Sequence, residues 1–187
     1  MTFRHVLTVA ILILGACASN DSVLNAATGD REAQFELGWN YMEGSGAVQD
    51  DDQAVRWFRK AAEQKHGAAQ LFLGWHYLEG RGVGQDDTQA IKWYRQAADR
   101  DLAQAQYALG WHYLEGRGVG QDDAQAVTWY RKAADNDLAQ AQYALGWHYF
   151  EGRGIEENPE QALAWFRKAA AQGDAQAREA LQILQTN

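Results

Sequence analysis

The sequence repeats itself with a period of 36 residues. The fifteen letters LGWHYLEGRGVGQDD run from Leu73 to Asp87 and return unchanged from Leu109 to Asp123. Glycine, alanine, tyrosine and tryptophan recur at the same spacing through four successive periods. Periods of about 20–50 residues are typical of proteins that stack copies of one small unit, each of which contacts only its neighbours. The repetition therefore predicts a solenoid.

Each period contains two predicted helices. Two glycines separated by one residue, as at Gly80 and Gly82, interrupt the apolar pattern once per period, so the period is not one long helix. In the second period we expect the first helix over residues 68–78 and the second over residues 87–98. Asp86, followed three residues later by glutamine, is the capping pattern that begins the second helix.

The fold class that follows is all-α. One unit cannot bury its apolar face alone, so stacked units must share a continuous core. We expect an α/α solenoid of four antiparallel helix pairs and a C-terminal capping helix over residues 30–187. The four repeats and the cap are expected at residues 31–66, 67–102, 103–138, 139–174 and 175–187.

The units follow the pattern A-x-x-x-L-G-x-x-Y-x-x-G-x-G-V…D-x-x-x-A-x-x-W-Y-x-x-A-A. This pattern resembles the Sel-one-like repeat, a relative of the tetratricopeptide repeat, and the resemblance covers residues 30–185. It implies an adaptor that assembles other proteins. The family often places glycine in the turn after the second helix. Here only Gly173 conforms, which leaves open how tight the other turns are; they carry Lys65, Asp101 and Asp137.

The first residues predict export of the chain. Arg4 precedes an apolar run over residues 6–14. Nine helical residues span roughly 14 Å, about half of the hydrocarbon core of a bilayer, so the run is too short to cross a membrane. A charge, a short apolar run and small residues make a secretory signal peptide. We therefore expect residues 1–16 to be removed from the mature protein.

The lone cysteine predicts a lipid anchor. Residues 14–17 read LGAC and resemble the lipobox of bacterial lipoproteins, which implies that Cys17 becomes a lipidated N-terminus. Residues 17–29 would then be a lipid-anchored tether. Ala18, rather than aspartate, follows the cysteine, and by resemblance to Gram-negative sorting rules this indicates the outer membrane, facing the periplasm. Ordinary cleavage after Ala18 is the alternative, and it would leave a soluble periplasmic protein.

The charge balance argues against nucleic acid as a partner. The chain has 25 acidic and 17 basic residues, a formal net charge of −8, and no block of basic residues. The same balance gives no electrostatic attraction to anionic lipid, so membrane contact is expected through the lipid anchor only.

No motif predicts catalysis, a cofactor or a metal. The glycine loops lack the preceding strand and the lysine of a phosphate-binding loop. The aspartate runs lack the spacing of a calcium loop and suit the first turn of a helix. His76, His112 and His148 occupy equivalent positions in stacked units, about 10 Å or more apart, too far to share one zinc ion. We expect a protein that is not an enzyme.

The first helix of each unit has a second apolar face that carries a tryptophan. This face is either sandwiched by neighbouring helices or presented to a partner, and the sequence leaves both open. Neighbouring histidine and arginine residues are typical material of binding hot spots. If the histidines are unperturbed, binding is expected to change between about pH 5.5 and 7.5. The candidate binding residues are Trp75, His76, Arg81, Trp111, His112, Arg117, Trp147, His148 and Arg153.

The function predicted is a non-catalytic protein–protein interaction scaffold in the bacterial cell envelope. Its partner would be a protein that presents an extended peptide or a helix across several units. The second possibility is a module that binds peptidoglycan or exopolysaccharide through the tryptophan faces. The third is a cell-wall-active hydrolase. Family members proposed to have such activity carry cysteine pairs, which these repeats lack.

Overall fold

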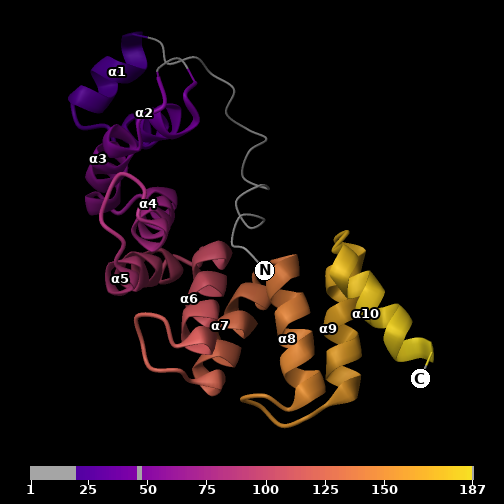
Figure 1. Ribbon diagram of the computed structural model, residues 1–187. Helices are drawn as coiled ribbons and strands as arrows, with labels where there is room; N and C mark the ends of the chain where they lie inside the picture. Colours follow the sequence, from indigo (N-terminus) through magenta and orange to yellow (C-terminus); the bar gives the residue numbers. More distant parts are fainter. Residues whose placement is uncertain (1–19, 46–47, 187) are drawn as a thin grey trace. The chain divides into compact units, whose positions relative to one another are not determined.

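The computed structural model describes residues 20–45 and 48–186 (Figure 1). Every regular element within these ranges is an α-helix, and the predicted all-α solenoid of helix pairs is confirmed. Residues 1–16 and Cys17, on which the predicted signal peptide and anchor depend, lie outside these ranges. The helices are α1 Asn20–Ala27, α2 Arg31–Glu43, α3 Asp51–Glu63, α4 Gly67–Glu79, α5 Asp87–Ala98, α6 Ala103–Glu115, α7 Asp123–Asp135, α8 Ala139–Glu151, α9 Pro159–Ala171 and α10 Ala175–Thr186.

The chain divides into two compact units, residues 1–97 and residues 98–187. In the first unit α1 packs on α2, α2 on α3 and α3 on α4. In the second unit each helix from α6 to α10 packs on the next one. Each repeat is a helical hairpin, and the second helix of one hairpin packs on the first helix of the next, as Figure 1 shows within each unit.

A glycine and an aromatic ring bring the two helices of each hairpin together. Gly74 of α4 faces the ring of Tyr94, and a Cβ atom at this glycine would lie 2.7 Å from the Tyr94 Cε1 atom. In the second unit a Cβ at Gly110 would lie 2.6 Å from the ring of Tyr130. No larger residue fits unless the ring moves. In α10 the corresponding residue is Gln182, so the last helix lacks the surface that receives a hairpin partner.

The second helices begin at the predicted caps. The Asp86 carboxylate accepts a hydrogen bond from the Gln89 amide at 3.0 Å, and Asn158 accepts one from Gln161 at the same distance. Pro159 occupies the first turn of α9, where the missing N–H leaves no helical hydrogen bond unmade. The local sequence therefore fixes where these helices start.

Buried glutamines join successive repeats. The Gln70 amide nitrogen donates to the Ala62 carbonyl at 3.1 Å and to the Gln96 side chain at 3.2 Å. In the second unit Gln142 donates to the Ala134 carbonyl at 3.2 Å. Both glutamines are 1% exposed. Each one therefore satisfies a carbonyl at the end of the preceding helix, where an unpaired buried group would be costly.

The prediction of a tether over residues 17–29 is wrong for residues 20–27. These residues form α1, and Ala26 is 1% exposed against α2. Gln34 donates to the Ala26 carbonyl at 3.2 Å, the same contact that Gln70 makes with Ala62. Helix α1 therefore packs on the first repeat as the end of a second helix would. Among its described side chains only Ala26 is buried, so no apolar periodicity marks this helix in the sequence.

The turns that lack glycine are as tight as the one that has it. Lys65, Asp101 and Asp137 adopt φ values of 65°, 58° and 58°, in the left-handed region where Gly173 lies at 95°. Side chains with a Cβ atom rarely take this conformation, although aspartate does so more readily than lysine. The fold thus imposes the turn on residues that do not favour it.

Candidate functional site

In the first unit Trp75 is half-buried. Trp75 packs against the core of the first two repeats, and its ring meets the His76 ring edge-on, with centroids 5.0 Å apart. The Arg81 guanidinium lies over the indole, 5.1 Å from its centroid. The structure thus brings Trp75 and Arg81 together and leaves part of both side chains at the surface.

The second unit repeats this arrangement once and varies it once. The Arg117 guanidinium lies 5.2 Å from the centroid of the Trp111 ring. Trp147 instead packs edge-on against the rings of Tyr143, Phe150 and Phe166, at centroid distances of 5.3–6.2 Å. All three tryptophans of the predicted site are partly exposed, so each one contributes to both the core and the surface.

The histidines do not belong to a binding surface, and the sequence prediction is wrong for them. His76 and His112 are 0% exposed, and His148 is 5% exposed. The Nδ1 atom of His76 donates to the Arg81 carbonyl at 2.8 Å, and the Nδ1 atom of His148 donates to the Arg153 carbonyl at 2.7 Å. Each histidine therefore holds the loop that follows its own helix and cannot touch a partner.

Burial also contradicts the expected pH response of binding. Desolvation by burial lowers the pKa of His76 below its usual 6.5, although the hydrogen bond to the Arg81 carbonyl opposes this shift. The pKa of His148 is lowered for the same reason. Both rings stay neutral in the folded protein at pH values where an exposed histidine would gain charge. Their titration changes the stability of the fold, not the charge of a surface.

The arginines fasten each loop to the preceding repeat. The Nε and Nη2 atoms of Arg81 donate to the two carboxylate oxygens of Asp51, at 2.9 and 3.0 Å. In the second unit the Arg153 Nε atom donates to Asp123 at 3.0 Å, and this bond raises the pKa of the arginine. Each loop lies against the first turn of the second helix of the preceding repeat. The arginine and its acidic partner are therefore 30 residues apart in the sequence.

The sequence of these repeats matches a known family. A family model described as the Sel1 repeat matches residues 31–66, 67–102, 103–138 and 139–174. The chain belongs to the Sel1 repeat family. Sel1 repeat proteins are generally non-catalytic protein-interaction scaffolds. A comparison with curated proteins gave no match.

Solved structures share the same architecture. The chain is 42% identical to c5321, a protective antigen of uropathogenic Escherichia coli strains with an SLR fold, over 86% of this chain and 34% of that one, with a TM-score of 0.84. It is 33% identical to a Sel1 repeat protein from Oxalobacter formigenes, over 85% and 61% of the two chains, with a TM-score of 0.77. Cysteine-rich protein B of Helicobacter pylori shares the fold at 23% identity, over 71% and 95%, with a TM-score of 0.57. The chain thus spans about a third of the first relative's length and about three fifths of the second's.

The second helices of the Sel1 repeats carry features that the sequence analysis missed. The Lys60 ammonium lies 3.8 Å from the centroid of the Trp57 ring, and the Arg59 guanidinium donates to the Tyr77 hydroxyl of the next repeat at 2.9 Å. Trp129 with Lys132 and Trp165 with Lys168 repeat the first contact at 4.1 and 4.0 Å. The signal was present in the sequence, because lysine follows tryptophan by three residues in three of the four repeats.

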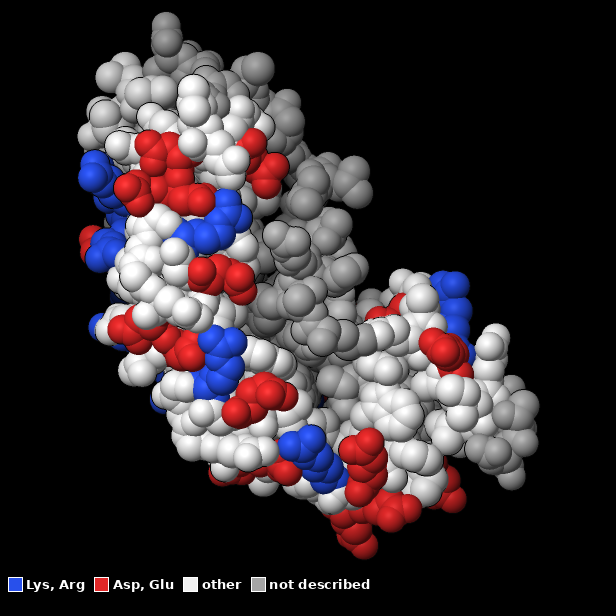
Figure 2. Space-filling model, in the orientation of Figure 1, with Lys and Arg blue, Asp and Glu red and all other residues white. Residues whose placement is uncertain are grey.

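Acidic and basic side chains alternate on the surface of the Sel1 repeats. Figure 2 shows red and blue groups interspersed on the face in view. Within the ranges that the structure describes, no group of three or more histidine, cysteine, aspartate or glutamate side chains could hold a metal ion. Over the same residues, every helix is too short or too polar to cross a bilayer.

Proposed function

We propose that this Sel1 repeat chain is a scaffold that binds a protein partner at the bacterial cell envelope. The observation that carries the choice of surface is the pairing of a half-buried tryptophan with an arginine, seen for Trp75 with Arg81 and for Trp111 with Arg117. An aromatic ring beside a guanidinium supplies apolar contact area and hydrogen-bond donors, the combination that binding hot spots favour. An extended peptide or a helix could contact such a pair within one unit.

The envelope part of the proposal rests on the sequence. A signal peptide over residues 1–16 and a lipid on Cys17 would place the repeats at the periplasmic face of the outer membrane. The alternative is a soluble periplasmic protein cleaved after Ala18. In either case residues 20–27 are helical, so less free chain would separate Cys17 from the first repeat than a tether to residue 29 implies.

Binding of a saccharide is the second candidate, and the arginines weigh against it. A sugar ring stacks on an open indole face, whereas Arg81 and Arg117 already lie over Trp75 and Trp111. The saccharide would have to displace them. A cell-wall hydrolase is the weakest candidate, because members of the family are generally non-catalytic.

Photo-crosslinking in cells tests the binding surface. Benzoylphenylalanine in place of Trp75 should yield an adduct that contains peptides of a second protein, identified by mass spectrometry. The same group in place of Arg167, an exposed residue of α9, is the matched control and should yield none. An adduct that muramidase releases would support the saccharide instead. Equal protein adducts at both positions would refute the assignment of the surface.

Labelling with an alkyne analogue of palmitate tests the anchor. The mature protein should carry acyl mass on Cys17 and partition into detergent, and Cys17→Ala should abolish both. A mature N-terminus at Ser19 without lipid would support the soluble alternative.

A further inference from the structure

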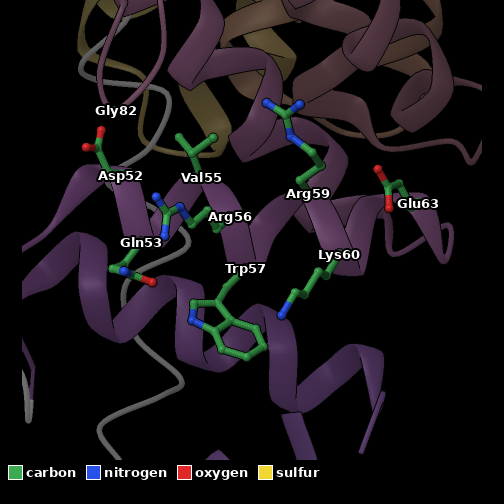
Figure 3. A pocket seen from close by; sticks show the side chains of 9 residues that line it. All are labelled: Asp52, Gln53, Val55, Arg56, Trp57, Arg59, Lys60, Glu63 and Gly82. Atoms are coloured by element: carbon green, nitrogen blue, oxygen red, sulfur yellow. The ribbon is translucent and has the colours of Figure 1, made fainter. Parts of the chain in front are cut away.

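A hollow lies along α3, and its lining does not include Trp75 or Arg81. Its floor is one face of α3, with Arg56, Trp57 and Lys60, and Gly82 of the next repeat forms part of its wall. We call it the α3 hollow. In Figure 3 Trp57 and Lys60 point to one side of α3 and Arg59 to the other, with Arg56 between them.

Three cations crowd this face in a protein that is acidic overall. Arg59 and Lys60 lie three and four residues after Arg56, so each is a neighbour of Arg56 on the helix surface. Like charges at this spacing repel and destabilise the helix. Asp52 and Glu63 line the two ends of the hollow and balance only part of that charge. A ligand that brings negative charge would relieve the repulsion.

The three cations are engaged to different extents. Arg59 donates to the Tyr77 hydroxyl at 2.9 Å, and Lys60 lies over the Trp57 ring at 3.8 Å. Arg56 is exposed, and it makes no hydrogen bond or ion pair with any residue in the described ranges. Arg56 therefore has all its donors available to a ligand, while its neighbours hold the shape of the surface around it.

The wall of the hollow is fixed in place. Gly82 has φ +66°, and a Cβ atom there would lie 2.1 Å from the Asp51 carbonyl oxygen. The paired hydrogen bonds of Arg81 to Asp51 hold the same loop on α3. The hollow is thus formed by two successive repeats and needs no rearrangement to accept a ligand.

We propose that the α3 hollow binds an acidic, extended peptide segment. One carboxylate of the segment pairs with the Arg56 guanidinium, and a second pairs with the Lys60 ammonium, which lies over the Trp57 ring. Bonds of this kind, between ionised groups, are the strongest class of protein hydrogen bond. Asp52 and Glu63 at the two ends disfavour a uniformly anionic surface such as a bilayer, but they leave room for a chain with spaced carboxylates. This site goes beyond the proposed function, because it lies on other helices and recognises charge.

The same protein contains a natural control for this site. On α7 the corresponding face has Trp129 with Lys132 at 4.1 Å, and Arg131 donates to the Tyr149 hydroxyl at 2.6 Å. Gly154 lies against Asp123 as Gly82 lies against Asp51. The residue that corresponds to Arg56 is Thr128, whose hydroxyl bonds the Ala124 carbonyl at 2.9 Å. The α7 face therefore has the same tryptophan–lysine and arginine–tyrosine contacts without the available cation, and Ala124 stands where Asp52 lines the α3 hollow.

Titration of the full chain, followed through the indole N–H resonances of its tryptophans, tests the proposal. The probe is a ten-residue peptide of alternating glycine and glutamate. The Trp57 resonance should move and saturate, while the Trp129 resonance stays in place. Arg56→Thr should weaken binding about tenfold or more, the loss expected for a charge-assisted hydrogen bond. Thr128→Arg should make the Trp129 resonance respond and add a second binding site.

Several outcomes would overturn the proposal. One is an equal shift with the matching glycine–glutamine peptide, and another is unchanged affinity in Arg56→Thr. A third is binding of phosphatidylglycerol vesicles, but not of the peptide, through Arg56. Both variants change exposed residues, so unchanged circular dichroism should show that they remain folded. Arg56→Thr should leave crosslinking at Trp75 intact, so the two surfaces can fail separately.

Discussion

The loop after the first helix is built differently in the first repeat and in the repeats that follow it. In the second repeat His76 holds the Arg81 carbonyl, and the Arg81 side chain bonds Asp51 of the repeat before. The fourth repeat has the same three partners. In the first repeat the two corresponding residues are Asn40 and Ser45, so the histidine and the arginine are missing together.

Helix α2, the first helix of the first repeat, folds without the histidine and the arginine. Helix α2 ends at Gly44 with φ 74°, as α4 ends at Gly80 with φ 68°, and it packs on α3. The glycine therefore ends the helix, and the histidine and arginine add the attachment of the loop to the preceding repeat.

The largest expected effect contrasts two core leucines at equivalent positions. Leu73 is 0% exposed in the core shared by the first two repeats, and Leu73→Ala should cost about 2–5 kcal/mol of unfolding free energy. Leu37 is 5% exposed beside the eight-residue α1, which can close over a smaller side chain. Leu37→Ala should therefore cost less. Urea denaturation of both variants measures the difference, and equal losses would show that α1 is packed as firmly as a full helix.

The second prediction replaces His76 of the second repeat with asparagine, the residue at the equivalent position of the first repeat. His76→Asn should leave the Arg81 carbonyl without its donor and cost about 1–3 kcal/mol at pH 7.5. Because burial lowers the pKa of His76 in the folded state, the unfolded chain takes up the proton first as the pH falls. Wild-type stability should therefore be fully present above pH 6.5 and decrease below it, by up to about 1.4 kcal/mol per pH unit for each such histidine.

Urea titrations at pH 7.5, 6.5 and 5.5 isolate this effect. The destabilisation caused by His76→Asn should shrink as the pH falls, because the variant lacks the group that titrates. His66 and the carboxylates are the same in both proteins, so their contributions cancel in the difference. A constant difference across the three pH values would mean that His76 does not couple protonation to folding.

The sequence predicted the helices well because local chemistry fixes them. The sequence alone shows the 36-residue period, the glycine at the helix end and the caps at Asp86 and Asn158. Gly74, where the helices approach closely, is one of the glycines that recur with this period. The fold class needed only these signals and the rule that a single unit cannot bury its own apolar face.

The sequence left open whether the tryptophan side of the first helix is buried. This helix has a second apolar face besides its core stripe, so periodicity cannot tell whether that second face is covered. Trp75 and His76 are neighbours in sequence, yet one is half-buried and the other is 0% exposed. The partner of His76 is a backbone carbonyl and the partner of Arg81 is 30 residues away, so neither contact leaves a local signature.

The third prediction removes the attachment between repeats. Arg81→Ser, which copies Ser45 of the first repeat, should cost about 0.5–1 kcal/mol, because both side chains of the pair are partly exposed to solvent. A double-mutant cycle with Asp51→Asn should recover most of this as coupling energy, and the coupling should weaken in high salt. Ser45→Arg is the control and should change stability little. If the losses of unfolding free energy caused by Arg81→Ser and Asp51→Asn are additive, the ion pair contributes nothing to the attachment between the two repeats.

The smallest expected effect contrasts the turn that closes the first repeat with the turn that closes the last. Lys65 sits at φ 65°, whereas the last repeat has Gly173 at φ 95°. A left-handed residue with a Cβ costs about 1–2 kcal/mol, and glycine loses about 0.5–1 kcal/mol more entropy on folding. Lys65→Gly should therefore stabilise the protein by about 0.5–1 kcal/mol.

Asp101→Gly should gain less stability, because aspartate tolerates this conformation better than lysine. Gly173→Lys should lose about what Lys65→Gly gains. Urea denaturation of the three variants in parallel measures this order, and a loss of stability in Lys65→Gly would mean that the lysine side chain makes contacts that outweigh its backbone strain.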